Sequence, residues 1–293
     1  MAGSWTLGII GGSGLYAIDA LEDAQWIQVD TPWGTPSDAL LTGRIGEAKL
    51  VFLPRHGRGH RIPPTDLNYR ANVDALKRAG CTDILAISAV GSLREELAPG
   101  RFVLVDQYID RTIARPSSFF GPGLVAHVSM ADPTCPRLSA LAADAAEAAG
   151  AQVTRGGCYV GIEGPQFSTR AESRAYRGWG GDVIGMTGMP EAKLAREAEL
   201  PYASVCMVTD WDSWRDGEEG ANVAEIVAQL HANAGIARRL IVELAKSLPK
   251  TREPSPIDSA LDGAILTAPE ARDPALVARL DAICGRVLGA SQS

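Results

Sequence analysis

The feature that most constrains the fold is an alternation between short apolar runs and longer stretches with helical periodicity. The apolar runs of strand length are Trp5–Ile10, Lys49–Leu53, Ile84–Val90, Phe102–Val105, Cys158–Ile162, Val183–Met186 and Tyr202–Val208. The helical patterns cover Asn68–Ala79, Pro136–Ala149, Ser168–Trp179, Pro190–Glu199 and Val223–Ser247. Nearly continuous apolar strands that alternate with helices are typical of a sheet covered on both faces. The sequence therefore predicts an α/β fold.

The region 248–258 interrupts this pattern, because it contains three prolines. A further helix is expected around Pro274–Leu288. We therefore predict one main domain over residues 1–248 and a C-terminal extension over residues 249–293. The extension could pack on a neighbouring subunit or be a simple terminal addition.

Composition argues against several classes of function. The 293-residue chain has a net charge of −7, which repels polyphosphate backbones and disfavours a nucleic-acid partner. Its five cysteines are scattered and form no Cys-x-x-Cys pair, so reduced thiols are expected rather than a zinc site or a disulfide framework. The N-terminus lacks a basic segment, and no apolar run approaches about 20 residues, which argues against export and against a membrane partner. We expect a cytoplasmic protein.

Polar side chains interrupt the apolar runs at the ends of several predicted strands. These sets are Gly11–Gly14, Arg55-His56, Ser88–Ser92, Met186-Thr187 and Thr209–Asp212. Ligands of open α/β sheets bind outside the carboxyl ends of the strands. We therefore expect these sets to surround one ligand site.

The segment Pro54-Arg-His-Gly57 is the best candidate for an anion site. The guanidinium of Arg55 offers a planar fork of donors suited to phosphate, and His56 can add another donor. A solvated basic turn is the main alternative, whereas glycines between His56 and His60 disfavour a metal site on a rigid helix. Gly11–Gly14 would let an anion approach backbone N–H groups, but a tight turn explains it equally well.

Two further segments contain candidate groups for binding a flat ligand. The carboxylates of Asp210 and Asp212 point to the same side of an extended segment. At the mouth of an apolar pocket such a carboxyl has a raised pKa, which suits a general acid or a donor to a ring nitrogen. The two aspartates could instead cap a helix or turn, or they could bind a divalent metal ion. Phe167 stands in a polar turn before a helix with capping-box spacing at Thr169 and Glu172, where an aromatic platform is a natural use.

Residue types alone therefore predict an α/β enzyme whose anion site and carboxylate site lie on one rim of the sheet, at the carboxyl ends of the strands. A longer series of ordered motifs is more specific. It comprises Gly8–Gly14, Asp30–Gly34, Pro54–Gly57, Asn68–Asn72, Ala89–Glu96, Asp106–Thr112, Ile162–Ser168, Arg170–Ser173, Met186-Thr187 and Thr209–Asp212. This series resembles the 5′-methylthioadenosine phosphorylase branch of the trimeric purine nucleoside phosphorylase family, over nearly the whole chain to about Ala245.

The resemblance implies a nucleoside phosphorylase catalytic domain over residues 1–248, built as a single-domain twisted mixed β-sheet with helices on both faces. It also implies a homotrimer with active sites at the subunit interfaces. The residues that match the family's phosphate site are Ser13, Arg55, His56, Ser88, Ala89 and Thr187. Those that match its nucleoside site are Phe167, Ser168, Met186, Val223, Ile226 and Val227, with His127 supplied by a neighbouring subunit. Asp210 and Asp212 match the catalytic carboxylates at the purine edge.

The reaction that the resemblance implies is phosphorolysis of 5′-methylthioadenosine, with phosphate as co-substrate and with neither a cofactor nor a metal. Two carboxylates favour a 6-amino purine, because a 6-oxo group would face an ionised acceptor. Gly185-Met-Thr-Gly-Met189 is also similar to enzymes of 5′-methylthioinosine, so a phosphorylase of 6-oxopurine nucleosides is the alternative. Hydrolytic nucleosidases and non-catalytic nucleoside-binding proteins are further alternatives.

Overall fold

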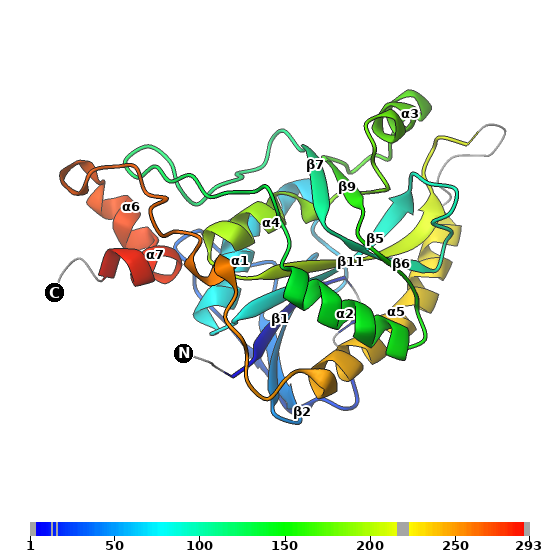
Figure 1. Ribbon diagram of the computed structural model, residues 1–293, viewed down its shortest axis with the longest axis horizontal. Helices are drawn as coiled ribbons and strands as arrows, with labels where there is room; N and C mark the ends of the chain where they lie inside the picture. The colour runs from blue at the N-terminus through cyan, green and yellow to red at the C-terminus, as the bar shows by residue number, and fades with distance from the viewer. Residues whose placement is uncertain (1–3, 13, 16, 216–222, 290–293) are drawn as a thin grey trace.

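The computed structural model describes residues 4–12, 14–15, 17–215 and 223–289. These residues form one mixed sheet with helices on both faces, which confirms the predicted fold class (Figure 1). The strands are β1 (Thr6–Gly11), β2 (Glu22–Ile27), β3 (Leu40–Ile45), β4 (Ala48–Pro54), β5 (Asp83–Ser92), β6 (Arg101–Val105), β7 (Gln107–Arg111), β8 (Gln152–Arg155), β9 (Cys158–Ile162), β10 (Val183–Gly185) and β11 (Tyr202–Trp211). The helices are α1 (Tyr69–Arg78), α2 (Pro136–Ala148), α3 (Arg170–Gly178), α4 (Gly188–Glu197), α5 (Val223–Ser247), α6 (Pro274–Arg279) and α7 (Asp281–Leu288).

The strand order places the longest strands at the centre of the sheet. Its main path runs β2-β3-β4-β1-β5-β10-β9-β7, while β11 pairs with β5 and leads on to β6 and β8. β1 is parallel to β4 and β5, and β11 is parallel to β5, so the carboxyl ends of these four strands meet at one edge. β10 departs from this arrangement, because it runs antiparallel to β5.

Two apolar layers cover the sheet. Helices α2 and α5 pack on each other and on β11, and Leu138, Leu240 and Leu244 are fully buried there. Helices α1 and α4 pack together on the opposite face, as Figure 1 shows, and α7 packs on α1. Asn68 begins α1, its side chain accepting the Ala71 N–H, and Gly80 follows the helix end with φ +80.

Four strands of the sheet were not predicted from the sequence: β2, β3, β7 and β8. β2, with the sequence Glu-Asp-Ala-Gln-Trp-Ile, is largely exposed, and β7 and β8 are only partly buried. Strands of this kind show no apolar run, because backbone pairing to a neighbouring strand forms them rather than burial of their side chains. The predicted C-terminal helix is divided at Leu280, which is fully buried, into α6 and α7.

The C-terminal extension packs on the body of its own chain. Ile257, Leu261 and Ile283 are buried in the apolar core. The guanidinium of Arg252 binds both carboxylate oxygens of Asp258, at 2.9 and 2.6 Å, and also bonds to the buried Asp83. The division into two domains, and any contact of the extension with a neighbouring subunit, remain predictions.

Candidate active site

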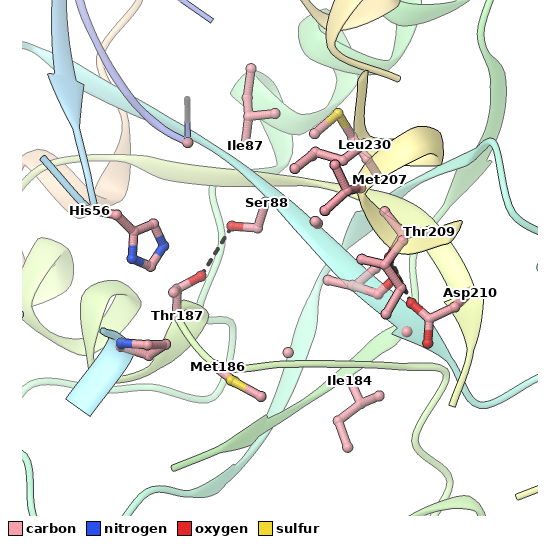
Figure 2. A pocket seen from close by; sticks show the side chains of 18 of the residues that line it. His56, Ile87, Ser88, Ile184, Met186, Thr187, Met207, Thr209, Asp210 and Leu230 are labelled. Carbon is pink, nitrogen blue, oxygen red and sulfur yellow. Dashed lines mark hydrogen bonds between the residues drawn. The ribbon is translucent and has the colours of Figure 1, made fainter. Parts of the chain in front are cut away.

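A cavity of about 440 Å³ opens where β5, β10 and β11 meet the N-terminal half of α5. A volume of this size is suited to a small-molecule ligand. Most of the residues predicted from the sequence line it: Arg55, His56, Ser88, Ala89, Phe167, Met186, Thr187, Asp210, Asp212, Ile226 and Val227. Figure 2 shows His56, Ser88 and Thr187 on one side of the cavity and Thr209 and Asp210 on the other.

Ser13 lies outside the described residues, and three other predicted residues do not line the cavity. Ser168 is buried beside Phe167, and Val223 is 63% exposed at the first residue of α5. His127 lies elsewhere, near Lys193 and Glu197. Its predicted role belongs to a neighbouring subunit, so that role stays a prediction.

Strand register explains why distant segments converge here. On the parallel pair β5 and β11, Cys206 is opposite Ser88 and Asp210 is opposite Gly91. The register shifts between Val208 and Asp210, so Thr209 is an extra residue. Such a bulge re-aims the side chains that follow it. β11 therefore directs Asp210 and Asp212 into the cavity.

The turn after β10 reaches the same cavity from the opposite direction. Because β10 is antiparallel to β5, with Ile184 opposite Gly91, the chain beyond it runs back alongside β5. This places the Thr187 hydroxyl 3.3 Å from the Ser88 hydroxyl. Two hydroxyl groups thus stand together at the side that also holds His56 (Figure 2).

The guanidinium of Arg55 is held in one orientation by a buried ion pair. Nε and Nη2 donate to Oε2 and Oε1 of Glu191 at 2.9 and 3.0 Å, and Nη1 donates to the Ile87 carbonyl at 3.1 Å. Tyr202 also donates to Glu191 Oε1, at 2.9 Å. Both charged side chains are almost fully buried. Among the described residues, these bonds leave one Nη1 hydrogen of Arg55 without an acceptor. Arg55 can therefore donate one N–H group to a ligand.

The imidazole of His56 is neutral at physiological pH. Burial and the adjacent charge of Arg55 lower its pKa to about 4. Its Nδ1 lies 2.9 Å from the Ile62 carbonyl, which can only accept, so Nδ1 carries the proton. Nε2 is then an acceptor rather than the additional donor expected from the sequence. The ring of His60, which also lines the cavity, stacks on His56 at 4.3 Å.

Asp210 is the carboxyl group whose chemistry the site alters most clearly. Burial raises its pKa to about 6, with the nearby Asp212 adding to the shift against a hydrogen bond from Thr209. The Thr209 hydroxyl donates to Asp210 Oδ1 at 2.7 Å and lies 3.2 Å from the Val90 carbonyl. This hydrogen bond favours the carboxylate, whereas burial favours the acid. The pKa of Asp210 therefore lies near the neutral range, as a general acid requires.

Asp212 is a second carboxyl group that lines the cavity. Burial raises its pKa as well. Its backbone N–H is bound to the Ser92 carbonyl, which fixes its position beside β5. Hydrogen bonds from the hydroxyls of Ser173 and Ser168 act against this rise in pKa and favour the carboxylate. As a carboxylate that lines the cavity, Asp212 can accept an N–H group of a ligand.

Gly185 and Gly188 are explained by the rings of Tyr159 and Tyr108. A Cβ on Gly185 would lie 2.2 Å from the Tyr159 hydroxyl, and one on Gly188 would lie 2.9 Å from the ring of Tyr108 and 3.1 Å from that of Tyr159. That hydroxyl accepts the backbone N–H groups of Thr187 and Gly188, each at 3.3 Å. The two glycines thus make room for aromatic rings from β9 and β7, so packing requires small residues at both positions.

Several residues that shape the site were not predicted from the sequence. Glu191 and Tyr159 act from behind the cavity, and no local pattern marks them. Met207, Leu230 and His231 line the cavity. Leu230 could have been found, because it lies four residues after Ile226 on the same helix face.

Across the described residues, no three histidine, cysteine or acidic side chains are grouped so that they could hold a metal ion. Within the same part of the chain, no helix is both long and apolar enough to cross a membrane.

The fold is that of a nucleoside phosphorylase, and the sequence pattern of the phosphorylase superfamily matches residues 6–246. The chain belongs to that superfamily. The S-methyl-5′-thioadenosine phosphorylase of Cereibacter sphaeroides is 60% identical to it over 284 residues, covering 96% of this chain and 98% of that one.

Solved structures show the same similarity. A methylthioadenosine phosphorylase from an antarctic soil metagenomic library is 44% identical, with a TM-score of 0.88 over 96% of this chain and 99% of that one. A mutant adenosine/methylthioadenosine phosphorylase from Schistosoma mansoni, in complex with methylthioadenosine, is 39% identical. Its TM-score is 0.78, over 83% of this chain and 91% of that one.

Proposed function

We propose that this protein cleaves 5′-methylthioadenosine with phosphate, giving adenine and 5-methylthioribose 1-phosphate. The similarity to methylthioadenosine phosphorylases over almost the whole chain supports this activity. The observation that carries it is one cavity, lined in part by Arg55, with hydroxyl groups on one side and a carboxyl group of raised pKa on the other. A role in purine and methionine salvage follows from these products.

The phosphate is expected to bind between Ser88, Thr187 and Arg55, with the backbone at Ala89 close by. Both hydroxyls can donate, and Arg55 adds a charge-assisted N–H. Neutral His56 can accept a hydrogen from a protonated oxygen of hydrogen phosphate. This arrangement favours the monohydrogen form of the anion, because Nε2 would otherwise face a phosphate oxygen lone pair.

The purine is expected to bind between Phe167 and the two carboxyls. As the C1′–N9 bond breaks, its electron pair moves to the purine and the ribose develops positive charge at C1′. Protonated Asp210 donates to N7 of the leaving base, while Asp212 accepts from the 6-amino group. A phosphate oxygen then forms the new bond to C1′, so no covalent enzyme intermediate and no cofactor is needed.

The 5′-thioether is expected to meet the apolar face of α5. Ile226, Val227 and Leu230 line the cavity on this side. Apolar groups here favour a methylthio group over a hydroxyl, by about 1–3 kcal/mol per group. Met186 lies between the two polar sides in Figure 2, where the ribose would pack on it.

We further propose that the protein is a cytoplasmic homotrimer in which His127 of one subunit closes the active site of the next. The position of His127 outside the cavity of its own chain supports this arrangement. Sedimentation equilibrium tests it. A monomeric mass in the active enzyme would contradict it.

The activity is tested by a substrate panel with and without phosphate. Adenine release from 5′-methylthioadenosine should require phosphate, and kcat/KM should be higher than with 5′-methylthioinosine. Release of base without phosphate would indicate a hydrolase, and a preference for the inosine thioether would indicate a 6-oxopurine phosphorylase. Binding without turnover would indicate a non-catalytic protein.

A further inference from the structure

Two turns carry the groups that would contact the nucleoside and the phosphate. The first, Glu163–Ser168, follows β9 and presents Phe167. The second, Met186–Gly188, follows β10 and presents Met186 and Thr187. The turns also touch each other, because a Cβ on Gly164 would lie 2.4 Å from Met186 Sδ.

The side chain of Arg115 lies behind both turns and binds their backbone. Nη1 donates to the carbonyls of Met186 and Met189 at 2.6 and 2.8 Å. Nη2 donates to the Glu163 carbonyl at 2.5 Å. Arg115 is 7% exposed and does not line the cavity, so it acts on a ligand only through the turns.

Glu163 fixes the guanidinium from the side of the first turn. Its Oε1 accepts from Arg115 Nε at 3.1 Å, and its Oε2 accepts the Ile113 N–H at 2.6 Å. Burial raises the pKa of Glu163, but these bonds outweigh it and leave the pKa below its usual value. The carboxylate is therefore ionised at neutral pH and holds the arginine in one orientation.

We propose that Arg115 is a positioning residue that sets the base-stacking turn and the phosphate-binding turn relative to each other. This rests on the proposed function. A planar guanidinium can donate in several fixed directions at once, whereas a lysine ammonium at the same site cannot reach both turns. Misplacement of a bound reactant by about 1 Å can cost about 100-fold in rate. Arg115 thereby couples the KM for the nucleoside to the KM for phosphate.

The test compares Arg115→Lys with Arg252→Ala. Arg252 is a matched control, because it is 9% exposed and binds the buried Asp83 and the partly exposed Asp258, but does not line the cavity. We expect Arg115→Lys to raise both KM values, and to lower kcat/KM by about 10- to 100-fold. Arg252→Ala should lower Tm and leave both KM values within about twofold.

Two further measurements separate positioning from loss of stability. Added guanidinium should raise the kcat/KM of Arg115→Ala part of the way towards the wild-type value. It should leave the kcat/KM of Arg252→Ala unchanged. Glu163→Gln keeps the shape of the carboxyl group and should raise both KM values, as Arg115→Lys does. This variant allows the proposal to be tested even if Arg115→Lys does not fold. Unchanged KM values, or a change in only one of them, would overturn the proposal.

The wild-type protein separates this proposal from the proposed function. If it shows no turnover of 5′-methylthioadenosine with phosphate, the function fails before any variant is made. If it turns over normally, only the variant data bear on Arg115. Equilibrium binding of adenine and of inorganic phosphate to Arg115→Lys, measured by calorimetry, gives a readout that does not depend on turnover, and both affinities should fall.

Discussion

Burial of Asp210 changes the pH at which this carboxyl group loses its proton. In the unfolded chain this carboxyl would titrate at 3.8, and in the folded protein its pKa is about 6. The native state therefore binds this proton more tightly than the unfolded state. The resulting contribution to stability is present at low pH and is lost as the pH rises from about 4 through 6.

The same pKa sets an expected pH dependence of activity. If Asp210 donates to N7, kcat/KM for 5′-methylthioadenosine should fall as the pH rises above about 6. Asp210→Asn should lower kcat by about 100- to 10,000-fold, which is the range for loss of a general acid. It should also remove the part of this pH-dependent fall that comes from Asp210, as measured by steady-state kinetics from pH 5 to about pH 9.

The phosphate co-substrate titrates in the same range, and Asp210→Asn provides the control because phosphate ionisation affects both proteins equally. The ratio of wild-type to variant kcat/KM therefore isolates Asp210. Near-normal activity of the variant, or a ratio that does not change with pH, would show that Asp210 is not the acid.

At the residue scale, the sequence indicated side chains whose type already suggests their chemistry. Asp210, Asp212 and Phe167 were found in this way, and all three line the cavity. Arg115 and Glu191 were not, because an arginine or a glutamate is ordinary on any surface. Their importance comes from burial and from partners 136 residues away, as in the pair of Arg55 with Glu191.

At the element scale, helix α5 brings an apolar face to the cavity. Ile226, Val227 and Leu230 line it, whereas Val223, one turn earlier, does not. The spacing predicted which side of the helix is apolar. The spacing of apolar residues did not predict which turn of α5 first contacts the cavity. This point depends on how α5 crosses β11.

This face allows a test of 5′ specificity. Val227→Thr keeps the shape of the side chain and adds a hydroxyl, which should help a 5′-hydroxyl more than a methylthio group. The kcat/KM ratio of 5′-methylthioadenosine to adenosine should therefore fall by about tenfold, within the range for one group in an apolar pocket. Ala228→Ser, exposed on the same helix and outside the cavity lining, should leave the ratio unchanged. An unchanged ratio in Val227→Thr would place the 5′ group elsewhere.

At the scale of the whole molecule, the C-terminal extension contributes to the core. Ile283 of α7 is 1% exposed and belongs to the apolar cluster that includes residues of α1 and α4. Ile283→Ala should therefore lower the free energy of unfolding by about 2–5 kcal/mol. Calorimetry should show one transition at a lower Tm. Two transitions, with the larger one unshifted, would show instead that the extension folds independently.

The class of fold, most of the helices and strands, and the types of residue that line the cavity could all be predicted from the amino-acid sequence. Apolar periodicity records which face of each element is buried, and this signal is local. The tertiary structure decided the rest: the antiparallel course of β10, the bulge at Thr209, the pairing of Arg55 with Glu191, and the contacts of Arg115. Each of these depends on segments far apart in the chain, and a hydrogen bond between them leaves no pattern in either segment alone.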